Sequence, residues 1–339
     1  MVVVLHGLRY ACGVTVPPLS PRDPSPRRGR RRAALPVAAV VLAAAVLALV
    51  TVWYVRGREP AAGPATARTT PRPLPASGSP GPSSVASASP SSKPRTGKLP
   101  PRPHIVAGAQ PVPILVYHRV ETKPLGPPLV DMSVRLFTKQ MAWLARNGYQ
   151  AVTLHRVYDA WTGHGLLPPR PIVLTFDDGY ADQVRNAAPI LRGYHWPAEL
   201  DLVSSALYTG EDPPATSLTP EMVQGLLDDG WGLESHSVSH LDLTRLWGRR
   251  LHRELYGSRT RLEQLFDAEV DFFCFPGGIY NRRVKLAVRR AGYLAATGTR
   301  YGAATPRDLF SLARIYAYGG ESMASFGSRL DQILAAAQD

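Results

Sequence analysis

Two acidic residues, Asp177 and Asp178, stand side by side at the end of an apolar stretch, Ile172–Phe176, in the sequence PIVLTFDDGYAD. Adjacent carboxylates repel each other, and at the end of a buried strand they are also costly to desolvate. A bound cation would offset the repulsion and keep both groups ionised near neutral pH. One Asp could then bind the cation while its neighbour remains free as a general base.

A second polar cluster, ESHSVSH, covers residues 234–240 and also ends a predicted strand. It places His236 and His240 four residues apart, and on a helical turn that spacing puts both imidazoles on one face. Taken alone, such a pair is more readily explained as an accident of the surface. Together with the Asp pair, the two histidines and one carboxylate would make three metal ligands and leave positions open for water, as in catalytic sites.

The elements that must position these residues alternate between strands and helices from residue 111 onward. Repeated β-then-α order predicts a parallel sheet covered by helices, either a barrel or a doubly wound sheet. In both folds ligands gather at the carboxyl ends of the strands, which is where the Asp pair lies. The predicted strands are 112–118, 149–154, 171–176, 197–203, 231–237, 271–275, 293–297 and 312–318. The predicted helices are 134–147, 181–192, 220–230, 244–267 and 281–291.

The net charge of +13 is confined to the first part of the chain. Residues 1–110 hold 15 of the 39 basic residues and 2 of the 26 acidic residues, which accounts for the whole excess. Residues 111–339 hold 24 of each and sum to zero. A neutral domain lacks the electrostatic footprint of a phosphate binder, so we expect no nucleic-acid partner.

The N-terminal part has the pattern of a membrane anchor and a stalk. The basic block RRGRRR (27–32) precedes Ala34–Val55, an uncharged run that is mostly Ala, Val and Leu. About 20 apolar residues span a bilayer, and the preceding arginines would keep the N-terminus in the cytoplasm. The alternatives are a buried core helix and a cleaved signal peptide, whose apolar core is shorter, at roughly 7–15 residues. We predict a cytoplasmic basic tail (1–33), a transmembrane helix (34–55), a Pro/Ser-rich disordered linker (56–110) and a globular domain (111–339).

TFDDG and HSVSH, in this order and at this separation, resemble two motifs of the polysaccharide deacetylase family, carbohydrate esterase family four. The resemblance covers about residues 112–335 and implies a distorted (β/α) barrel with parallel strands. It implies that Asp177 is the general base and that Asp178, His236 and His240 bind a divalent metal. The metal in the family is usually zinc and sometimes cobalt or manganese.

FFCFPGG (272–278) resembles the third motif of the family, in which a backbone N–H beside the proline holds the tetrahedral oxyanion. That position falls on Gly277, where the family commonly has an aromatic residue. The family also commonly has an arginine where this chain has Cys274, and this arginine orients and tunes the catalytic Asp. Its absence puts the control of Asp177 in doubt. Cys274 itself is expected to be a small core residue.

The final Leu-x-His motif of the family, whose histidine acts as general acid, is absent, because no histidine follows His252. One subgroup, the deacetylases of poly-β-1,6-N-acetylglucosamine in biofilms, instead carries the acid at the end of an N-terminal strand ending in Tyr-His. PVPILVYHRV (111–120) is similar, which implies that His118 is the acid. The alternative is a histidine that only forms hydrogen bonds.

The resemblance therefore implies a single-pass, membrane-anchored, metal-dependent hydrolase that removes N-acetyl groups from a cell-envelope or extracellular glycan and releases acetate. Poly-N-acetylglucosamine, peptidoglycan and chitin-like polymers are the candidate substrates. The alternatives are a non-catalytic glycan-binding member of the fold and an O-acetyl esterase of the xylan type. We expect a monomer at the cell membrane, or a secreted protein if the apolar segment is cleaved. Five tryptophans could include a sugar-stacking platform, although most should be core: Trp143, Trp161, Trp196, Trp231 and Trp247.

Overall fold

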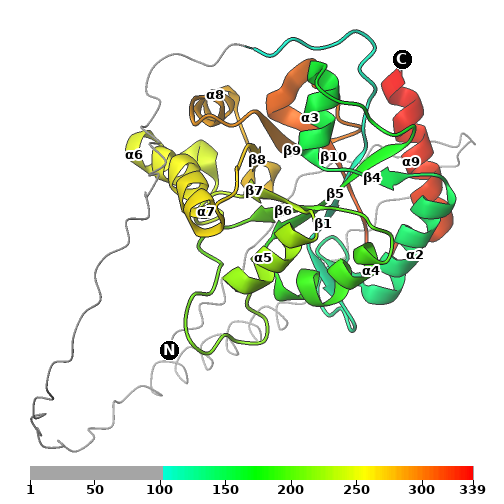
Figure 1. Ribbon diagram of the computed structural model, residues 1–339, viewed down its shortest axis with the longest axis horizontal. Coiled ribbons are helices and arrows are strands. Elements are labelled where there is room, and N and C mark those ends of the chain that lie inside the picture. The colour runs from blue at the N-terminus through cyan, green and yellow to red at the C-terminus, as the bar shows by residue number, and fades with distance from the viewer. Residues whose placement is uncertain (1–101, 339) are drawn as a thin grey trace, which may run out of the picture. The chain divides into compact units, whose positions relative to one another are not determined.

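The computed structural model describes residues 102–338, and its centre is a closed barrel of parallel strands (Figure 1). Around the barrel the strands follow the order β1, β10, β9, β8, β7, β6 and β5, and pairing of β5 with β1 closes the ring. These strands are Ile114–Tyr117 (β1), Pro171–Asp178 (β5), Glu199–Leu202 (β6), Gly232–Ser235 (β7), Phe272–Cys274 (β8), Ala295–Tyr301 (β9) and Leu312–Tyr316 (β10). The prediction of a parallel (β/α) barrel is confirmed.

Three short strands lie outside the ring. Strand β4 (Gln150–Ala151) pairs with the start of β5. Strands β2 (Arg119–Glu121) and β3 (Asp131–Ser133) pair with each other in parallel directly after β1. They continue the chain beyond His118, so the segment that carries this histidine is anchored on both sides.

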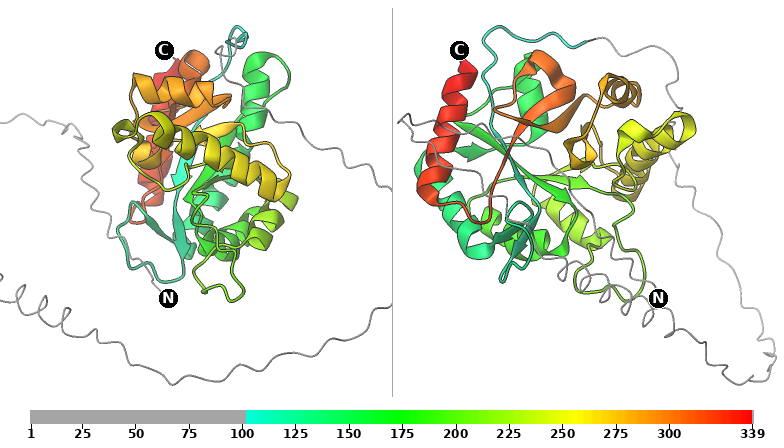
Figure 2. Two further views of the ribbon diagram at one scale, coloured as in Figure 1. Left: turned by 90° about the vertical axis from the view of Figure 1, so that its left-hand side faces the viewer. Right: turned by 180° about the vertical axis from the view of Figure 1, so that it is seen from behind.

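Helices surround the barrel, as the views in Figures 1 and 2 show from three sides. They are Val134–Arg146 (α2), Leu154–Thr162 (α3), Ala188–Arg192 (α4), Pro220–Asp228 (α5), Gly248–His252 (α6), Ser258–Phe266 (α7), Arg282–Arg290 (α8) and Met323–Gln338 (α9). Side chains cap several helix starts and accept otherwise unpaired N–H groups. Ser133 caps α2, Thr219 caps α5 and Asn281 caps α8.

The apolar core has two parts. The larger part packs the outer face of the barrel against the helices, and includes Phe176, Leu200 and Phe273. The smaller part closes the amino-terminal end of the barrel, where α3 packs on the first residues of β1, β8, β9 and β10. The carboxyl-terminal ends of the strands are therefore the end that remains for a functional site.

Two expected elements differ in the structure. The predicted strand 149–154 contributes only β4, because Thr153 caps the unpredicted helix α3. The predicted helix 244–267 is broken: a short 3₁₀ turn, Leu243–Arg245, is followed by extended backbone at Leu246 and Trp247 before α6 begins. Arg283 accounts for the break, because it binds main-chain oxygens in this segment that a helix would use internally.

The predicted membrane helix, Ala34–Val55, and the linker up to residue 101 lie outside the described residues. Within residues 102–338 no helix is both long and apolar enough to cross a bilayer. The described end of the linker lies against α3, where the Val106 N–H donates to the Trp161 carbonyl at 2.9 Å.

Candidate active site

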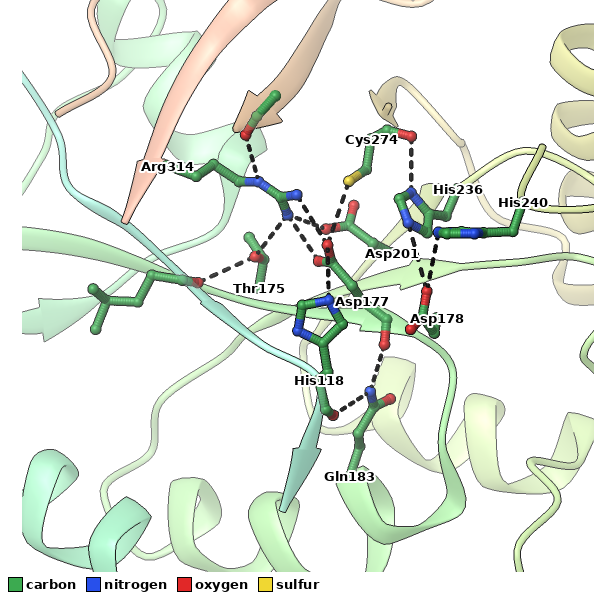
Figure 3. Close-up of polar contacts among 12 residues, drawn as sticks. His118, Thr175, Asp177, Asp178, Gln183, Asp201, His236, His240, Cys274 and Arg314 are labelled. Atoms are coloured by element: carbon green, nitrogen blue, oxygen red, sulfur yellow. Dashed lines mark hydrogen bonds and ion pairs between the residues drawn. The ribbon is translucent and has the colours of Figure 1, made fainter. Parts of the chain in front are cut away.

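The carboxyl-terminal end of the barrel brings Asp177 together with a buried arginine, Arg314, from the last strand (Figure 3). Arg314 holds both carboxylate oxygens of Asp177, with Nη1 2.8 Å from Oδ1 and Nη2 2.9 Å from Oδ2. The guanidinium also donates to the Thr175 hydroxyl at 3.2 Å and, through Nε, to the Gly298 carbonyl at 3.0 Å. Such a two-point contact fixes both the position and the plane of the carboxylate.

This pairing keeps Asp177 ionised. Burial alone would raise the pKa of its carboxyl, but the Arg314 guanidinium, followed by His118 and His236, holds the pKa of Asp177 well below its ordinary value. Asp177 thus has an arginine partner although Cys274 stands where the family commonly has one. The arginine comes from β10 instead of from the third motif, and the Cys274 thiol lies in the core 3.7 Å from Asp177 Oδ2.

Three further carboxyls fill the barrel below Arg314. Two of them, Asp201 and Glu234, lie level with Asp177, because in the strand register Asp177 is opposite Asp201 and Asp201 is opposite Glu234. Glu199 lies one layer lower. Burial, with the mutual repulsion of the acids, raises the pKa of Asp201 and of Glu234 well above the ordinary range, and burial raises that of Glu199 to about 7. Asp201 lies within reach of Arg314, with Oδ2 3.2 Å from Nη1.

Asp178, His236 and His240 converge on one point beside Asp177. Asp178 Oδ1 is 3.6 Å from His236 Nε2 and 3.4 Å from His240 Nε2. Tetrahedral ligands at zinc distances of about 2.0–2.1 Å are separated by about 3.3 Å, so the three atoms fit a single ion. A left-handed backbone at Asp178, with φ 74°, turns its carboxylate toward the histidines and away from Asp177.

His236 has the protonation state and the tautomer that a metal ligand needs. Its Nδ1 lies 2.9 Å from the Cys274 carbonyl, which can only accept, so Nδ1 carries the proton and Nε2 faces Asp178 with a lone pair. Burial lowers the pKa of His236 to about 4, so the ring is neutral at pH 7. Cys274 thus supports the site through its main chain.

The two histidines do not share a helical turn, and this expectation from their spacing is wrong. They lie on a loop after β7 in which Ser237 and His240 have φ of 67° and 52°. The loop is tied internally, with the His240 N–H donating to Ser237 Oγ at 3.0 Å. The Glu254 carboxylate accepts from the N–H groups of residues 238 and 239 at 3.0 and 2.8 Å. These bonds bring the rings to 4.8 Å between centroids without a helix.

Two other groups of possible ligands are weaker. The group Asp177, His236 and Cys274 would need a carboxylate whose two oxygens are already held by Arg314 and a thiol whose pKa is raised by burial. A third group, His155 with Glu269 and Asp271, lies at the other end of the barrel. There Asp271 already pairs with His155 at 3.1 Å and with Arg259 at 3.3 Å. The set Asp178, His236 and His240 is therefore the best candidate metal site.

His118 lies on the other side of Asp177, directly after β1. Its Nε2 is 3.9 Å from Asp177 Oδ2, and its ring stacks on Tyr316 with centroids 6.3 Å apart. Gln183 fixes the spacing of the two segments, because its amide nitrogen donates to the main-chain oxygens of both His118 (2.8 Å) and Asp177 (2.7 Å). Gln183 lies in a π-helical turn, Gln183–Ala187, after β5.

Gly277 lies in the turn that follows β8, with a left-handed φ of 59°. The N–H groups of Gly278 and Ile279 close the turn on the carbonyls of Phe275 (2.7 Å) and Pro276 (3.1 Å). The Gly277 N–H takes no part in these two bonds. A residue with a side chain would be strained at this φ, which gives a reason for glycine where the family has an aromatic residue.

All the residues singled out by the sequence thus come from neighbouring strand ends, and three partners were missed. Arg314, Asp201 and Gln183 complete the surroundings of Asp177. Arg314 had a sequence signal, since it is the only charge in the apolar stretch LARIYAY and would need a buried acid as partner.

Comparison with known proteins gives one family. Residues 165–296 match the family model for polysaccharide deacetylase. Over 223 residues the chain is 27% identical to YxkH of Bacillus subtilis (strain 168), which is named as a polysaccharide deacetylase, and the match covers 66% of this chain and 77% of that protein. Over 127 residues it is 33% identical to the poly-beta-1,6-N-acetyl-D-glucosamine N-deacetylase of Escherichia coli (strain K12), covering 36% of this chain and 19% of that protein.

Solved structures share the fold. The Streptococcus pyogenes deacetylase PplD, in complex with acetate, matches 65% of this chain and 98% of its own with a TM-score of 0.60 and 24% identity. IcaB from Ammonifex degensii matches 68% of this chain and 98% of its own with a TM-score of 0.55 and 21% identity.

Proposed function

Because the chain carries a polysaccharide deacetylase domain, we propose that it is a metal-dependent hydrolase that removes N-acetyl groups from a cell-envelope or extracellular glycan. The observation that carries this proposal is the ionised carboxylate of Asp177, held by Arg314 beside a cluster of three potential metal ligands. A base beside an ion site is the arrangement by which a metal-dependent enzyme can activate water for the hydrolysis of an amide.

In this proposal Asp178, His236 and His240 hold the metal, most simply Zn²⁺, with Co²⁺ or Mn²⁺ as alternatives. When bound, a divalent metal would polarise the acetamide carbonyl and lower the pKa of a water molecule. The Cys274 carbonyl orients His236 for this role, because it fixes the proton on Nδ1.

Asp177 is the proposed general base, which takes a proton from the attacking water. Arg314 keeps its carboxylate ionised and aimed, and therefore acts as a positioning residue. Attack of the water oxygen on the carbonyl carbon gives a tetrahedral oxyanion, toward which the Gly277 N–H would donate.

His118 is the proposed general acid. The carbon–nitrogen bond breaks as His118 gives a proton to the leaving amine, so that acetate and a free amino sugar are released. Its position on the other side of Asp177 from the ligand cluster suits this division of roles (Figure 3). The Gln183 bridge keeps the segments of acid and base in register.

Poly-N-acetylglucosamine is the substrate that we propose first, because the Escherichia coli relative is named for that polymer. Peptidoglycan and chitin-like polymers are the other candidates. We also propose that the segment 34–55 anchors the protein in the cell membrane with the domain outside, which rests on the sequence alone. An anchored enzyme would act on a polymer at its own cell surface.

Acetate release by the purified full chain tests the proposal. Three substrates are compared: a β-1,6-linked N-acetylglucosamine oligomer, a chitooligosaccharide and acetylated xylan, each with metal content measured alongside. Release from an N-acetylated oligomer, lost in Asp177→Asn, is the expected result. Release from acetylated xylan alone would make the protein an O-acetyl esterase, and binding without any release would make it a non-catalytic glycan-binding member.

A further inference from the structure

Three exposed apolar side chains lie on segments that leave the barrel mouth. Leu241, Trp247 and Ile279 are 46%, 68% and 48% exposed. All three lie on the segments that follow β7 and β8, and these segments also carry His240 and Gly277. Single exposed apolar residues are ordinary. Three on the two segments that build the site form a surface, which we call the apolar rim.

Trp247 is the exception among the tryptophans. Of the five that the structure describes, two are buried and two are half-buried, and only Trp247 is exposed: Trp161 and Trp231 buried, Trp143 and Trp196 half-buried. Most of this large ring is left in water, and burial in the core does not account for it, so a ligand on its exposed surface is the natural explanation.

Arg283, in the first turn of α8, holds the Trp247 ring in place. Its guanidinium carbon lies 3.7 Å from the ring centroid, which places the cation over one face. The guanidinium is itself fixed by main-chain oxygens of the segment before Trp247, at 2.7 Å from Leu246, and 3.0 and 3.4 Å from residues 244 and 243. The exposed part of the ring is therefore its opposite face and its edges.

We propose that Trp247 is a sugar-binding platform, on which a pyranose ring of the N-acetylated glycan stacks away from the reacting sugar. The inference rests on the proposed function, since it extends the same site. A polymer whose acetamide reaches Asp177 can continue across the segments after β7 and β8, which also carry His240 and Gly277. The C–H face of a pyranose is apolar and flat, which matches an indole ring, and Leu241 and Ile279 add exposed apolar surface on the same two segments. Because Arg283 orders the ring beforehand, little conformational freedom is lost on binding.

The length dependence of the substrate separates this role from a structural one. In the full chain, Trp247→Ala is expected to lower kcat/KM for a β-1,6-linked N-acetylglucosamine hexamer by roughly 3- to 10-fold, through KM. Hydrolysis of a small aryl acetate and metal content should not change. Trp247→Phe should restore part of the loss. Leu265→Ala, which removes an exposed apolar side chain on α7, is the matched control and should have no effect.

Equal loss on hexamer and aryl acetate, or no loss on the hexamer, would overturn the proposal. Direct binding of the hexamer to wild type and to Trp247→Ala is measured in parallel by calorimetry. If wild type binds the hexamer without releasing acetate and Trp247→Ala binds it more weakly, the platform stands and the proposed reaction fails. If the two proteins bind equally, the platform fails whatever the reaction.

Discussion

Replacing Arg314 by Met removes the guanidinium that holds Asp177 and leaves a side chain of similar length in the core. Wild-type Asp177 has a lowered pKa, so its ion pair stabilises the fold above the ordinary carboxyl range and is lost only in strong acid. In the variant, burial becomes the dominant influence and raises the pKa of Asp177 instead. The deficit in free energy of unfolding should therefore already be present near pH 4, where the wild-type pair is intact, and should grow toward pH 7, where the buried carboxyl of the variant is forced to ionise.

The size of the effect follows from the burial of the pair. Arg314 and Asp177 are 1% and 3% exposed, and removing one partner of a buried ion pair costs about 3–5 kcal/mol. With a denaturant slope near 3 kcal/mol per M, the urea midpoint at pH 7 should fall by about 1–2 M. A neighbouring opposite charge lowers the pKa of a carboxyl by about one to three units. Removing that charge should therefore move the acidic limb of the kcat/KM profile to higher pH by about the same amount.

The assay is a pH profile of acetate release with urea unfolding at pH 4.5 and pH 7. Arg314→Lys keeps the charge but loses the two-point contact, so it should move the acidic limb less and provides a variant that folds if Met does not. Arg259→Met is the matched control, because Arg259 pairs with Asp271 far from Asp177. Loss of activity by the same factor at every pH, with a deficit in stability that is independent of pH, would refute the reasoning.

Three further predictions follow from the site and the barrel. First, metal content should fall in each of the ligand variants Asp178→Ala, His236→Ala and His240→Ala. Asp177→Asn should instead keep its metal and be inactive, and equal metal loss in this variant would mean that the two roles are shared. Second, His118→Ala should lower N-deacetylation by about 10²–10⁴-fold but aryl acetate hydrolysis far less, since an aryl oxide leaves without a proton; equal losses would place His118 in another role. Third, Glu199 has a pKa raised to about 7, so the folded state holds its proton longer than the unfolded state and stability falls as pH rises from about 4.5 to 7, by about 3 kcal/mol. Glu199→Gln keeps the acceptor for the Leu154 N–H and should reduce the loss of stability over this pH range in urea unfolding by that amount, and an unchanged loss would assign it to other groups, such as Asp201 and Glu234.

Short stretches of sequence predicted the fold class and most of the candidate site. Alternating strands and helices indicated a parallel α/β fold and placed Asp177 and the two histidines at strand ends, while the resemblance of the motifs to polysaccharide deacetylases indicated the barrel and His118. The predicted starts of two helices, at residues 134 and 220, agree with those of α2 and α5. These are positions where a few adjacent residues determine the structure.

The parts that could not be predicted depend on contacts between distant segments. Arg314 and Asp177 are 137 residues apart, and no local pattern pairs them. The break before Trp247 depends on Arg283, which belongs to another helix. The approach of His236 and His240 depends on a loop held by Glu254 and by left-handed backbone, so their spacing suggested a helix that does not exist.

The place of β1 in the ring has a consequence for the biosynthesis of the protein. β1 is the first strand of the barrel to be synthesised, yet its two neighbours are β5 and the last strand, β10. Until β10 has emerged from the ribosome, β1 has an unpaired edge and Asp177 has no counter-ion. Domains generally begin to fold from their N-terminal part during synthesis, and pairing between distant strands is slow. Completion of this site must therefore follow the synthesis of β10, and a nascent chain that ends before residue 314 would hold Asp178, His236 and His240 without the arginine that orients Asp177.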